Sequence, residues 1–241
     1  MPHPSTDSTS DPLAWLTGLE GVPSAFAATR DGIDVLLRDR GLRRTSPEQT
    51  TESLLRGAHA SAELAGSSSN LEEVRDGTGD EIAQSAVRVS TELLSLVPVI
   101  GRSPLQAFAR LHVLAGGSGQ PGSAEGAKRL QSLSTTLLAT STPGLIVAAL
   151  VHADLATAEP FGSHDGIVAR AAERLVMVAR GVDPASVVVP EAGHLALRAA
   201  YESNLRGYRD GGAAGVHAWL LYAPEAYSAG AEASPLRRSA D

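Results

Sequence analysis

The stretch Glu159-Pro160-Phe161-Gly162-Ser163-His164-Asp165-Gly166-Ile167-Val168-Ala169-Arg170 separates two helical patterns. A proline and an aromatic residue follow the first helix, a small polar loop comes next, and the second helix is expected to begin near Val168. The backbone amides at that helix start, together with the positive end of the helix dipole, form a potential anion site. Arg170 lies in the first turn, where it could reach the same anion. The stretch therefore predicts a helix–loop–helix unit that can bind a negatively charged group.

Helical spacing of apolar residues continues outward from this stretch in both directions. One helix is predicted from Gly144 to about Thr157, and another from Val168 to Arg180. Further helices are predicted over 47–65, 82–97, 105–111, 130–137, 201–208 and 216–223, and Pro98 is expected to stop the second of these. The only β-branched run covers 186–189. We therefore expect a mostly all-α protein with at most a short β-hairpin.

The composition favours close-packed helices and excludes several classes of function. The chain has 241 residues, of which 39 are alanine and only 4% are aromatic, and alanine has the highest helix propensity. The absence of cysteine excludes disulfides, thiol nucleophiles and cysteine-bound zinc. A formal charge of -7 disfavours nucleic acid as a partner. No signal peptide or membrane-spanning run is visible, so we expect a cytoplasmic protein without a membrane partner.

The domain organisation expected from the sequence is a single domain with short tails. Residues 1–11 and 231–241 are polar, lack periodicity and are predicted to be disordered. Residues 12–230 form the predicted domain, with N-terminal helices over 12–80 and a core over about 81–230. Residues 117–122 match the pattern GxGxxG, but a helix precedes them and a proline lies within them. We interpret this segment as a loop, because a dinucleotide site needs a preceding strand.

The seven histidines show no spacing typical of a metal site. None forms the i, i+4 histidine pair with an intervening acid that is typical of metalloproteases, and no acidic cluster surrounds them. His59, His112, His152 and His217 lie within helical patterns and are interpreted as hydrogen-bonded helix residues, while His194 flanks the start of a helix. We therefore predict no metal site, and a site built from histidines is the alternative.

The loop after Glu159 resembles that of the Fic (Fido) family, which follows the pattern HPFx[D/E]GNGRxxR between two central helices. In register with that pattern, Pro160, Phe161, Gly166 and Arg170 match. The matching positions are those that shape the backbone of the loop and place its last arginine.

Other segments strengthen the resemblance. Residues 145–157 and 169–181 are similar to the family's helices before and after the loop, and 201–220 resembles its closing helices, where a YxxAL…Y..GD…W.L pattern is common. The resemblance covers about residues 45–230, and most of it lies in 143–222. It implies a Fic-like helical domain with an N-terminal helical extension.

The resemblance also implies a chemistry. Active Fic proteins typically transfer AMP, or another phosphate-containing group, from a nucleotide to a hydroxyl of a target. Their general base falls on Glu159, their metal-holding acid on Ser163 and their first motif arginine on Ile167. Their GNG segment falls on 164–166, so the charge of Asp165 stands where phosphates are expected. A carboxylate, with a usual pKa of about 4, is a weak base at neutral pH unless burial raises its pKa.

The candidate catalytic residues are Glu159 and His164, the second because an imidazole titrates near neutral pH. The residues expected to form an anion or nucleotide site are Phe161, Gly162, Ser163, Asp165, Gly166 and Arg170. No metal ligand is assigned. If the chain is active, the resemblance implies ATP or another nucleotide with Mg²⁺ as its cofactor. The sequence assigns no cofactor beyond these.

The helix that ends near Ala65 resembles the inhibitory helix of many Fic proteins, with the pattern [S/T]xxxE[G/N]. Ser61 and Gly66 match, whereas Ala65 stands where a glutamate pairs with the second motif arginine. A register that uses Glu63 loses the match at Gly66. The resemblance implies a remnant of the regulatory helix that lacks its ion pair with Arg170.

Three hypotheses for the function follow. The first is a degenerate Fic-like protein that keeps an anion-binding or nucleotide-binding loop but lacks ordinary AMP transfer. The second is an active nucleotidyltransferase or phosphotransferase that modifies protein hydroxyls with an atypical base or donor. The third is a non-catalytic interaction or scaffold protein whose cleft is filled by side chains. A nucleotide and a protein target are the expected partners, and the sequence fixes neither the oligomeric state nor whether the chain is an enzyme.

Overall fold

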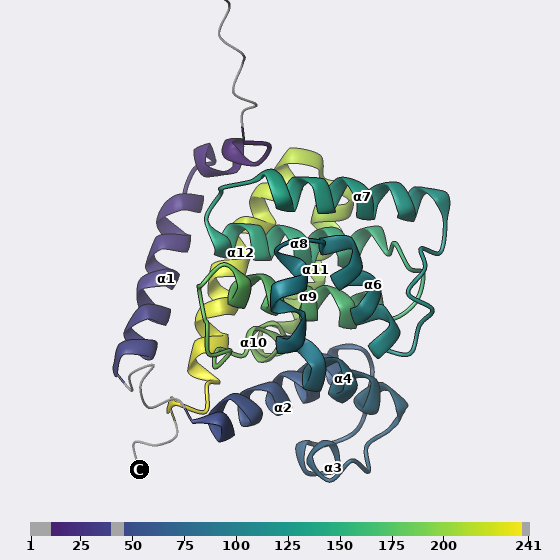
Figure 1. Ribbon diagram of the computed structural model, residues 1–241. Helices are drawn as coiled ribbons and strands as arrows, with labels where there is room; N and C mark the ends of the chain where they lie inside the picture. The colour runs from purple at the N-terminus through teal and green to yellow at the C-terminus, as the bar shows by residue number, and fades with distance from the viewer. Residues whose placement is uncertain (1–10, 40–45, 238–241) are drawn as a thin grey trace, which may run out of the picture.

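The computed structural model describes residues 11–39 and 46–237, and this part of the chain contains helices and no strand (Figure 1). The elements are η1 (Ala14–Gly18), α1 (Val22–Asp39), α2 (Pro47–Leu64), α3 (Leu71–Arg75), α4 (Glu81–Glu92), η2 (Leu93–Leu96), α5 (Val97–Ile100), α6 (Pro104–Leu114), α7 (Ala124–Ala139), α8 (Gly144–Ala158), α9 (Asp165–Ala179), α10 (Pro190–Ala196), α11 (Arg198–Asp210) and α12 (Gly212–Glu232), where η marks a 3-10 helix. The all-α fold expected from the sequence is confirmed. The β-branched run over 186–189 is an irregular connection.

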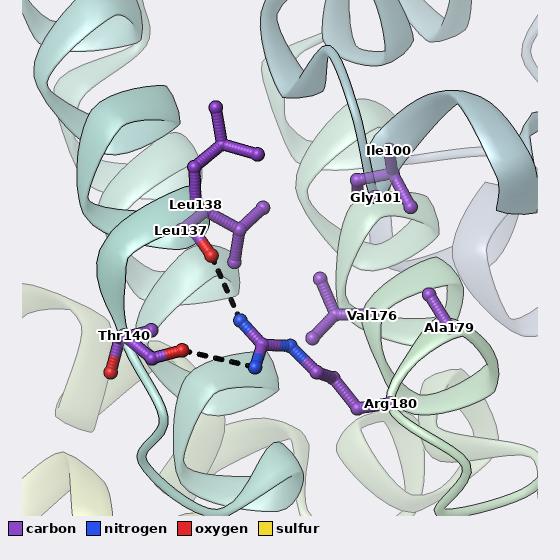
Figure 2. A pocket seen from close by; sticks show the side chains of 8 residues that line it. All are labelled: Ile100, Gly101, Leu137, Leu138, Thr140, Val176, Ala179 and Arg180. Carbon is purple, nitrogen blue, oxygen red and sulfur yellow. Dashed lines mark hydrogen bonds between the residues drawn. The ribbon is translucent and has the colours of Figure 1, made fainter.

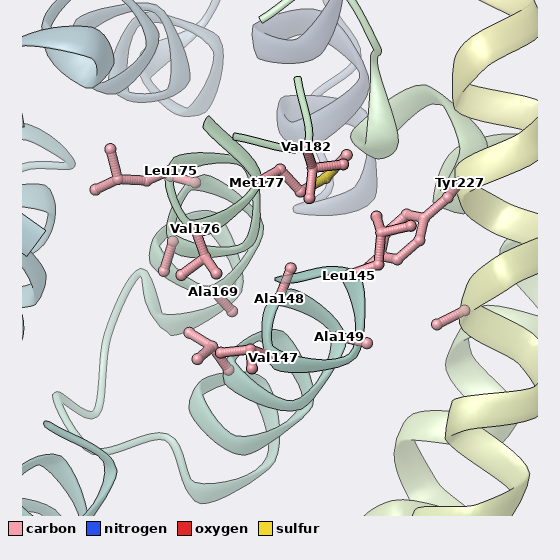
Figure 3. Packing of buried hydrophobic residues seen from close by; sticks show 14 of the residues in the cluster. Leu145, Val147, Ala148, Ala149, Ala169, Leu175, Val176, Met177, Val182 and Tyr227 are labelled. Carbon is pink, nitrogen blue, oxygen red and sulfur yellow. The ribbon is translucent and has the colours of Figure 1, made fainter. Parts of the chain in front are cut away.

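Helices α8 and α9 occupy the centre of the fold and pack along each other (Figure 1). α8 is apolar on nearly every face, which is typical of a helix surrounded by other helices. Figure 3 shows Val147 and Ala148 of α8 directed toward Ala169 and Val176 of α9. The distance between packed helices depends on the side chains at their contact, so small alanines bring the two axes close. The alanine-rich composition thus builds the helix pair on either side of the loop.

The C-terminal helices cover one side of this central pair. α12 packs against α10, α11 and α1, and Trp219 of α12 donates a hydrogen bond from Nε1 to the carbonyl oxygen of Ala149 in α8, at 2.8 Å. α11 also packs against α8, which brings its polar face beside the loop between α8 and α9. None of the described helices combines the length and the apolar character needed to cross a membrane.

On another side, α2 and α4 pack together and also contact α9. α2 begins at a capping box in which the side chains of Ser46 and Gln49 bond to each other's backbone amides, and Pro47 occupies its first turn. These residues fix where α2 starts and hence where its later turns lie against α9. The sequence prediction of a helix over 47–65 agrees with α2 within one residue.

The helix predicted over 82–97 is interrupted, and the prediction that Pro98 stops it is wrong. α4 ends at Glu92, the 3-10 helix η2 follows, and Pro98 lies in the first turn of α5. A proline is tolerated there because the first amides of a helix have no partner within the helix. The apolar periodicity continues through the interruption, so spacing alone could not reveal it.

The predicted C-terminal tail also differs from the structure. α12 continues to Glu232, and Leu236 beyond it is only 2% exposed. The amide of Val189 donates to the carbonyl oxygen of Gly230 at 3.1 Å, which attaches this end of α12 to the segment before α10. Residues 231–237 are therefore packed against the domain, while 238–241 and the first ten residues of the predicted tail 1–11 lie outside the described residues.

The residue at the boundary of the predicted N-terminal tail is tied to the domain. The carboxylate of Asp11 accepts hydrogen bonds from the Thr140 hydroxyl and the Ser141 amide, each at 2.7 Å. The Thr140 bond, with others, holds the pKa of Asp11 below its usual value. Arg180, at the end of α9, donates to the carbonyl oxygens of Leu137 and Thr140 beside a hollow of about 210 Å³ (Figure 2). The Arg180 guanidinium thus bonds to carbonyl oxygens at the end of α7 that have no partner within the helix.

Candidate active site

The loop between α8 and α9 carries the motif residues in a compact backbone turn. Glu159 ends α8 with φ 44°, Gly162 has φ 76°, and His164 precedes α9 with φ 56°. A non-glycine residue in this left-handed region costs about 1–3 kcal/mol and persists only where its surroundings hold it. α9 begins at Asp165, three residues before the predicted start at Val168. The first amides of α9 therefore lie nearer to the loop than the sequence prediction placed them.

A second loop, residues 116–122, holds the motif loop in place. The Gly122 amide donates to the carbonyl oxygen of Pro160 at 3.0 Å, and the ring of Phe161 stacks on that of His112 with centroids 4.2 Å apart. A Cβ atom on Gly117 would overlap the His112 ring. The GxGxxG match is thus a loop, as expected, and Gly117 allows it to pack closely against this histidine.

The carboxylate of Asp165 turns back into the motif loop. It accepts a hydrogen bond from the Phe161 amide at 3.0 Å, and the amides of Gly162 and Ser163 also favour its charged form. Burial raises the pKa of Asp165, against the effect of these amides. Loop amides that could hold the oxygens of a phosphate are therefore directed at a side chain of the chain itself.

The two candidate catalytic residues are both exposed. The Glu159 side chain is 62% exposed and forms an ion pair with Arg209 of α11 at 3.2 Å. A carboxylate becomes an effective general base near neutral pH when burial makes its charge costly, and Glu159 lacks such burial. His164 also faces solvent, and its ring centroid is 6.1 Å from that of His112.

Ser163 is placed next to a histidine, but the pair does not form a nucleophile and base. Its hydroxyl lies 3.2 Å from Nε2 of His112, and the Gly119 amide donates to Nδ1 of the same ring at 3.2 Å. Because Nδ1 accepts, a neutral His112 carries its proton on Nε2 and donates it toward Ser163. Burial, together with the charge of His164, lowers the pKa of His112. The ring thus orients Ser163 and cannot deprotonate it.

Arg170, the motif arginine that remains, is only 3% exposed. Its Nε donates to the Ser61 hydroxyl at 2.9 Å, its Nη2 to the Ser61 carbonyl oxygen at 2.8 Å, and its Nη1 to the Tyr201 hydroxyl at 3.2 Å. The structure thus places Ser61, from the segment that resembles the regulatory helix, directly against Arg170. Ala65 and Gly66 lie exposed at the end of α2. Among the described residues, the ion pairs of the structure include none to Arg170.

These residues surround an open cleft of about 480 Å³, which is within the usual size range of ligand sites. Of the candidate site residues, Glu159, Gly162, Ser163, His164, Asp165, Gly166 and Arg170 line it. Phe161 does not, because it is buried against His112. Leu64 and Ala156 also line the cleft, and its other lining residues, which sequence reasoning missed, are on α11: Tyr201, Glu202, Leu205, Arg206 and Arg209. Their distance from the motif along the chain left no signal that they belong to the site.

A wholly buried polar cluster lies behind Tyr201. The Tyr201 hydroxyl is 3.0 Å from Nε2 of His152, whose Nδ1 is 2.9 Å from a carboxylate oxygen of Glu173. Burial lowers the pKa of His152 to about 4. Burial raises the pKa of Glu173, but the two imidazoles of His152 and His194 outweigh it and hold that pKa below its usual value. Tyr201 thus connects this cluster to Arg170.

The comparisons with known proteins support the fold. No family model matches the chain, and no curated protein sequence matches it. The crystal structure of a Fic family protein from Desulfovibrio desulfuricans G20 is similar to it, with a TM-score of 0.67 and 16% sequence identity. The match covers 85% of this chain and 73% of that one. The chain therefore has a Fic-like helical fold, in which the loop between α8 and α9 lies at an open cleft.

Proposed function

We propose that this chain is a Fic-like protein without ordinary AMP-transfer activity, whose cleft remains a binding site for a phosphate-bearing ligand such as a nucleotide. The observation that carries this proposal is the position of Asp165. Its carboxylate accepts a hydrogen bond from the Phe161 amide inside the motif loop and is nearly buried there. A transferred phosphate would need those amides, and it would meet a negative charge on them.

Each group needed for the chemistry is also missing or occupied. Glu159 stands in place of the base, but it is exposed and paired with Arg209. Ser163, in place of the metal-holding acid, offers a neutral hydroxyl that faces His112. Mg²⁺ prefers carboxylate oxygens and phosphates, so this position supports no strong Mg²⁺ site. Ile167, in place of an arginine, is buried in the core.

Binding has different support. The cleft is open, and Arg206 and Arg209 of α11 are among the residues that line it. Arginine binds phosphate oxygens through paired N–H groups. Arg209 has a partner in Glu159, which is exposed enough to move away without leaving a buried charge. A phosphate group would therefore be held by α11 and not by the loop amides.

The test separates transfer from binding. We expect no transfer of label from α-labelled ATP to the proteins of a cell lysate when the purified chain and Mg²⁺ are added. Strong labelling that is lost in Glu159→Ala or His164→Ala would show an active transferase and refute the proposal. Calorimetric titration with ATP, ADP and CTP tests the second half. We expect weak heat that is lost in the double variant Arg206→Ala/Arg209→Ala.

The absence of both heat and thermal shift with every nucleotide would contradict the ligand site. The remaining hypothesis, an interaction protein whose cleft does not bind nucleotides, would then be favoured. Lys128→Ala is a matched control for the loss of positive charge, because Lys128 is exposed on α7 and does not line the cleft.

A further inference from the structure

Three potential metal ligands converge in the interior of the fold from three different helices. His152 of α8, Glu173 of α9 and His194 of α10 all have side chains that are 0% exposed. Nδ1 of His152 is 2.9 Å and Nε2 of His194 is 3.0 Å from the same oxygen, Oε2 of Glu173. Within the described ranges, one atom from each of these residues lies within 4.8 Å of the others. This cluster lies behind the cleft, which it meets at Tyr201 and Arg170.

The spacing of these atoms matches that of ligands around one metal ion. Two atoms bound to a metal at about 2.1 Å are about 3.0 Å apart at right angles and about 3.4 Å apart at the tetrahedral angle that zinc prefers. The separations of 2.9 and 3.0 Å from the shared carboxylate oxygen match the first value and lie about 0.5 Å below the second, so a tetrahedral ion would move these side chains slightly apart. Two imidazoles with one carboxylate form a ligand set that zinc and other first-row divalent metals use.

Nδ1 of His152 is a buried polar atom without an aligned hydrogen-bond partner. Nδ1 of His152 makes no hydrogen bond, although the Glu173 oxygen is so close. The oxygen therefore lies off the direction in which this ring nitrogen would donate or accept. A polar atom that is buried without a partner is costly to the fold. A metal ion would give this nitrogen a partner, whereas the Glu173 oxygen is already hydrogen-bonded to Nε2 of His194 at 3.0 Å.

The remaining polar atom of each residue is held by a tyrosine hydroxyl. Tyr201 is 3.0 Å from Nε2 of His152, and Tyr222 is 2.9 Å from Nδ1 of His194. Tyr227 donates to Oε1 of Glu173 at 2.8 Å. Metal-binding histidines and carboxylates commonly have such a second partner, which fixes the orientation of the ligand and, for histidine, the nitrogen that carries the proton. The outer contacts thus leave one atom of each residue directed at a common point.

We propose that His152, Glu173 and His194 bind one divalent transition metal ion, with Zn²⁺ as its representative. The ion would join α8, α9 and α10 inside the core and so add to the stability of the fold. It would also orient Tyr201, whose hydroxyl accepts a hydrogen bond from Arg170 at 3.2 Å. The guanidinium of Arg170 is a positive charge that faces the cluster. Because it repels a metal cation, the affinity of the site for the ion is lower than that of the same three ligands without it.

The test starts from the full chain, purified with a tag that contains no histidine and without chelators. Because the site is closed, the protein is unfolded in guanidinium with a chelator, and refolded either with excess Zn²⁺ or with the chelator. After desalting, we expect about one zinc per chain by mass spectrometry in the first sample. We expect its Tm to be about 5 °C or more above that of the second sample.

Variants assign the ion to these residues. Glu173→Gln and His194→Gln are expected to reduce the bound zinc to a small fraction, while the control His59→Gln, at a partly exposed histidine on α2, keeps it. A wild-type chain that refolds with native circular dichroism, retains no zinc and has the same Tm in both samples would refute the site, whatever the variants do. Equal zinc retention by wild type and by a folded Glu173→Gln variant would refute it as well.

Discussion

Replacing Asp165 by Asn removes the negative charge from the motif loop while it keeps the shape of the side chain. The carboxylate lies 3.0 Å from the amide nitrogen of Phe161, so a phosphate oxygen bound to the same amide would be about 4 Å or less from it. Two unit charges at 4 Å repel by about 1 kcal/mol in water and by about 4 kcal/mol in the environment of a protein surface. The cleft is open but the carboxylate is nearly buried, so the repulsion is expected between these limits.

For a phosphate that reaches the loop amides, an intermediate value of about 2 kcal/mol corresponds to an affinity about 30-fold higher in Asp165→Asn than in wild type. Calorimetric titration with Mg-ATP at two salt concentrations measures this ratio. The expected gain decreases at high salt, because ions screen the repulsion in an open cleft. Asp76→Asn, at an exposed position after α3, is the control for the change in net charge. If Asp165→Asn is folded and binds ATP no more tightly than wild type, the loop is not blocked by this carboxylate.

Three further comparisons test the packing and the buried charges, with stability measured by urea unfolding. Gly193→Ala should lower the free energy of unfolding by about 1–3 kcal/mol, because its Cβ would overlap the backbone of α12. Gly207→Ala has open space at its Cβ and should stabilise α11 by about 0.5–1 kcal/mol. Equal effects of the two substitutions would contradict the packing. Arg174→Leu leaves the Glu191 carboxylate buried without the guanidinium that lies 3.1 Å away, and should lower the free energy of unfolding by about 3–5 kcal/mol. Adding Glu191→Gln should recover part of this loss. Purely additive losses in the double variant would refute the pairing. Burial raises the pKa of Asp183 above 3.8, so the folded state holds its proton more tightly and ionisation costs stability as pH rises through the raised pKa. The stability of Asp183→Asn relative to wild type should therefore increase from about pH 4 to about pH 7, and a flat difference would contradict the raised pKa.

The sequence was most informative where one physical signal dominates. The bounds of α8 and α2 agree with the prediction within a residue or two, because apolar spacing, a capping serine and glycine punctuation all indicate the same ends. The prediction was poorer for 82–97, where the apolar face continues although the helix does not. It was wrong for 231–237, where a few apolar residues in a polar segment are enough to attach it to the domain.

The site was predictable only in part, for the same reason. Glu159 and His164 lie together because they belong to one loop, and that much follows from adjacency in the sequence. The role of Asp165 as an acceptor for the loop amides depends on a backbone turn that composition does not specify. Contributions from α11, and the meeting of His152 with Glu173, depend on how helices pack. No pattern along a single sequence encodes such contacts between distant elements.

The most direct measurement is a crystal structure of the protein soaked with Mg²⁺ and a non-hydrolysable ATP analogue. We predict that the Phe161 amide still donates to Asp165, and that any bound phosphate lies at Arg206 and Arg209. Phosphate oxygens on the amides of the motif loop, with the Asp165 carboxylate displaced and Arg170 turned from Ser61 toward them, would contradict the proposal that the loop has lost its phosphate-handling role.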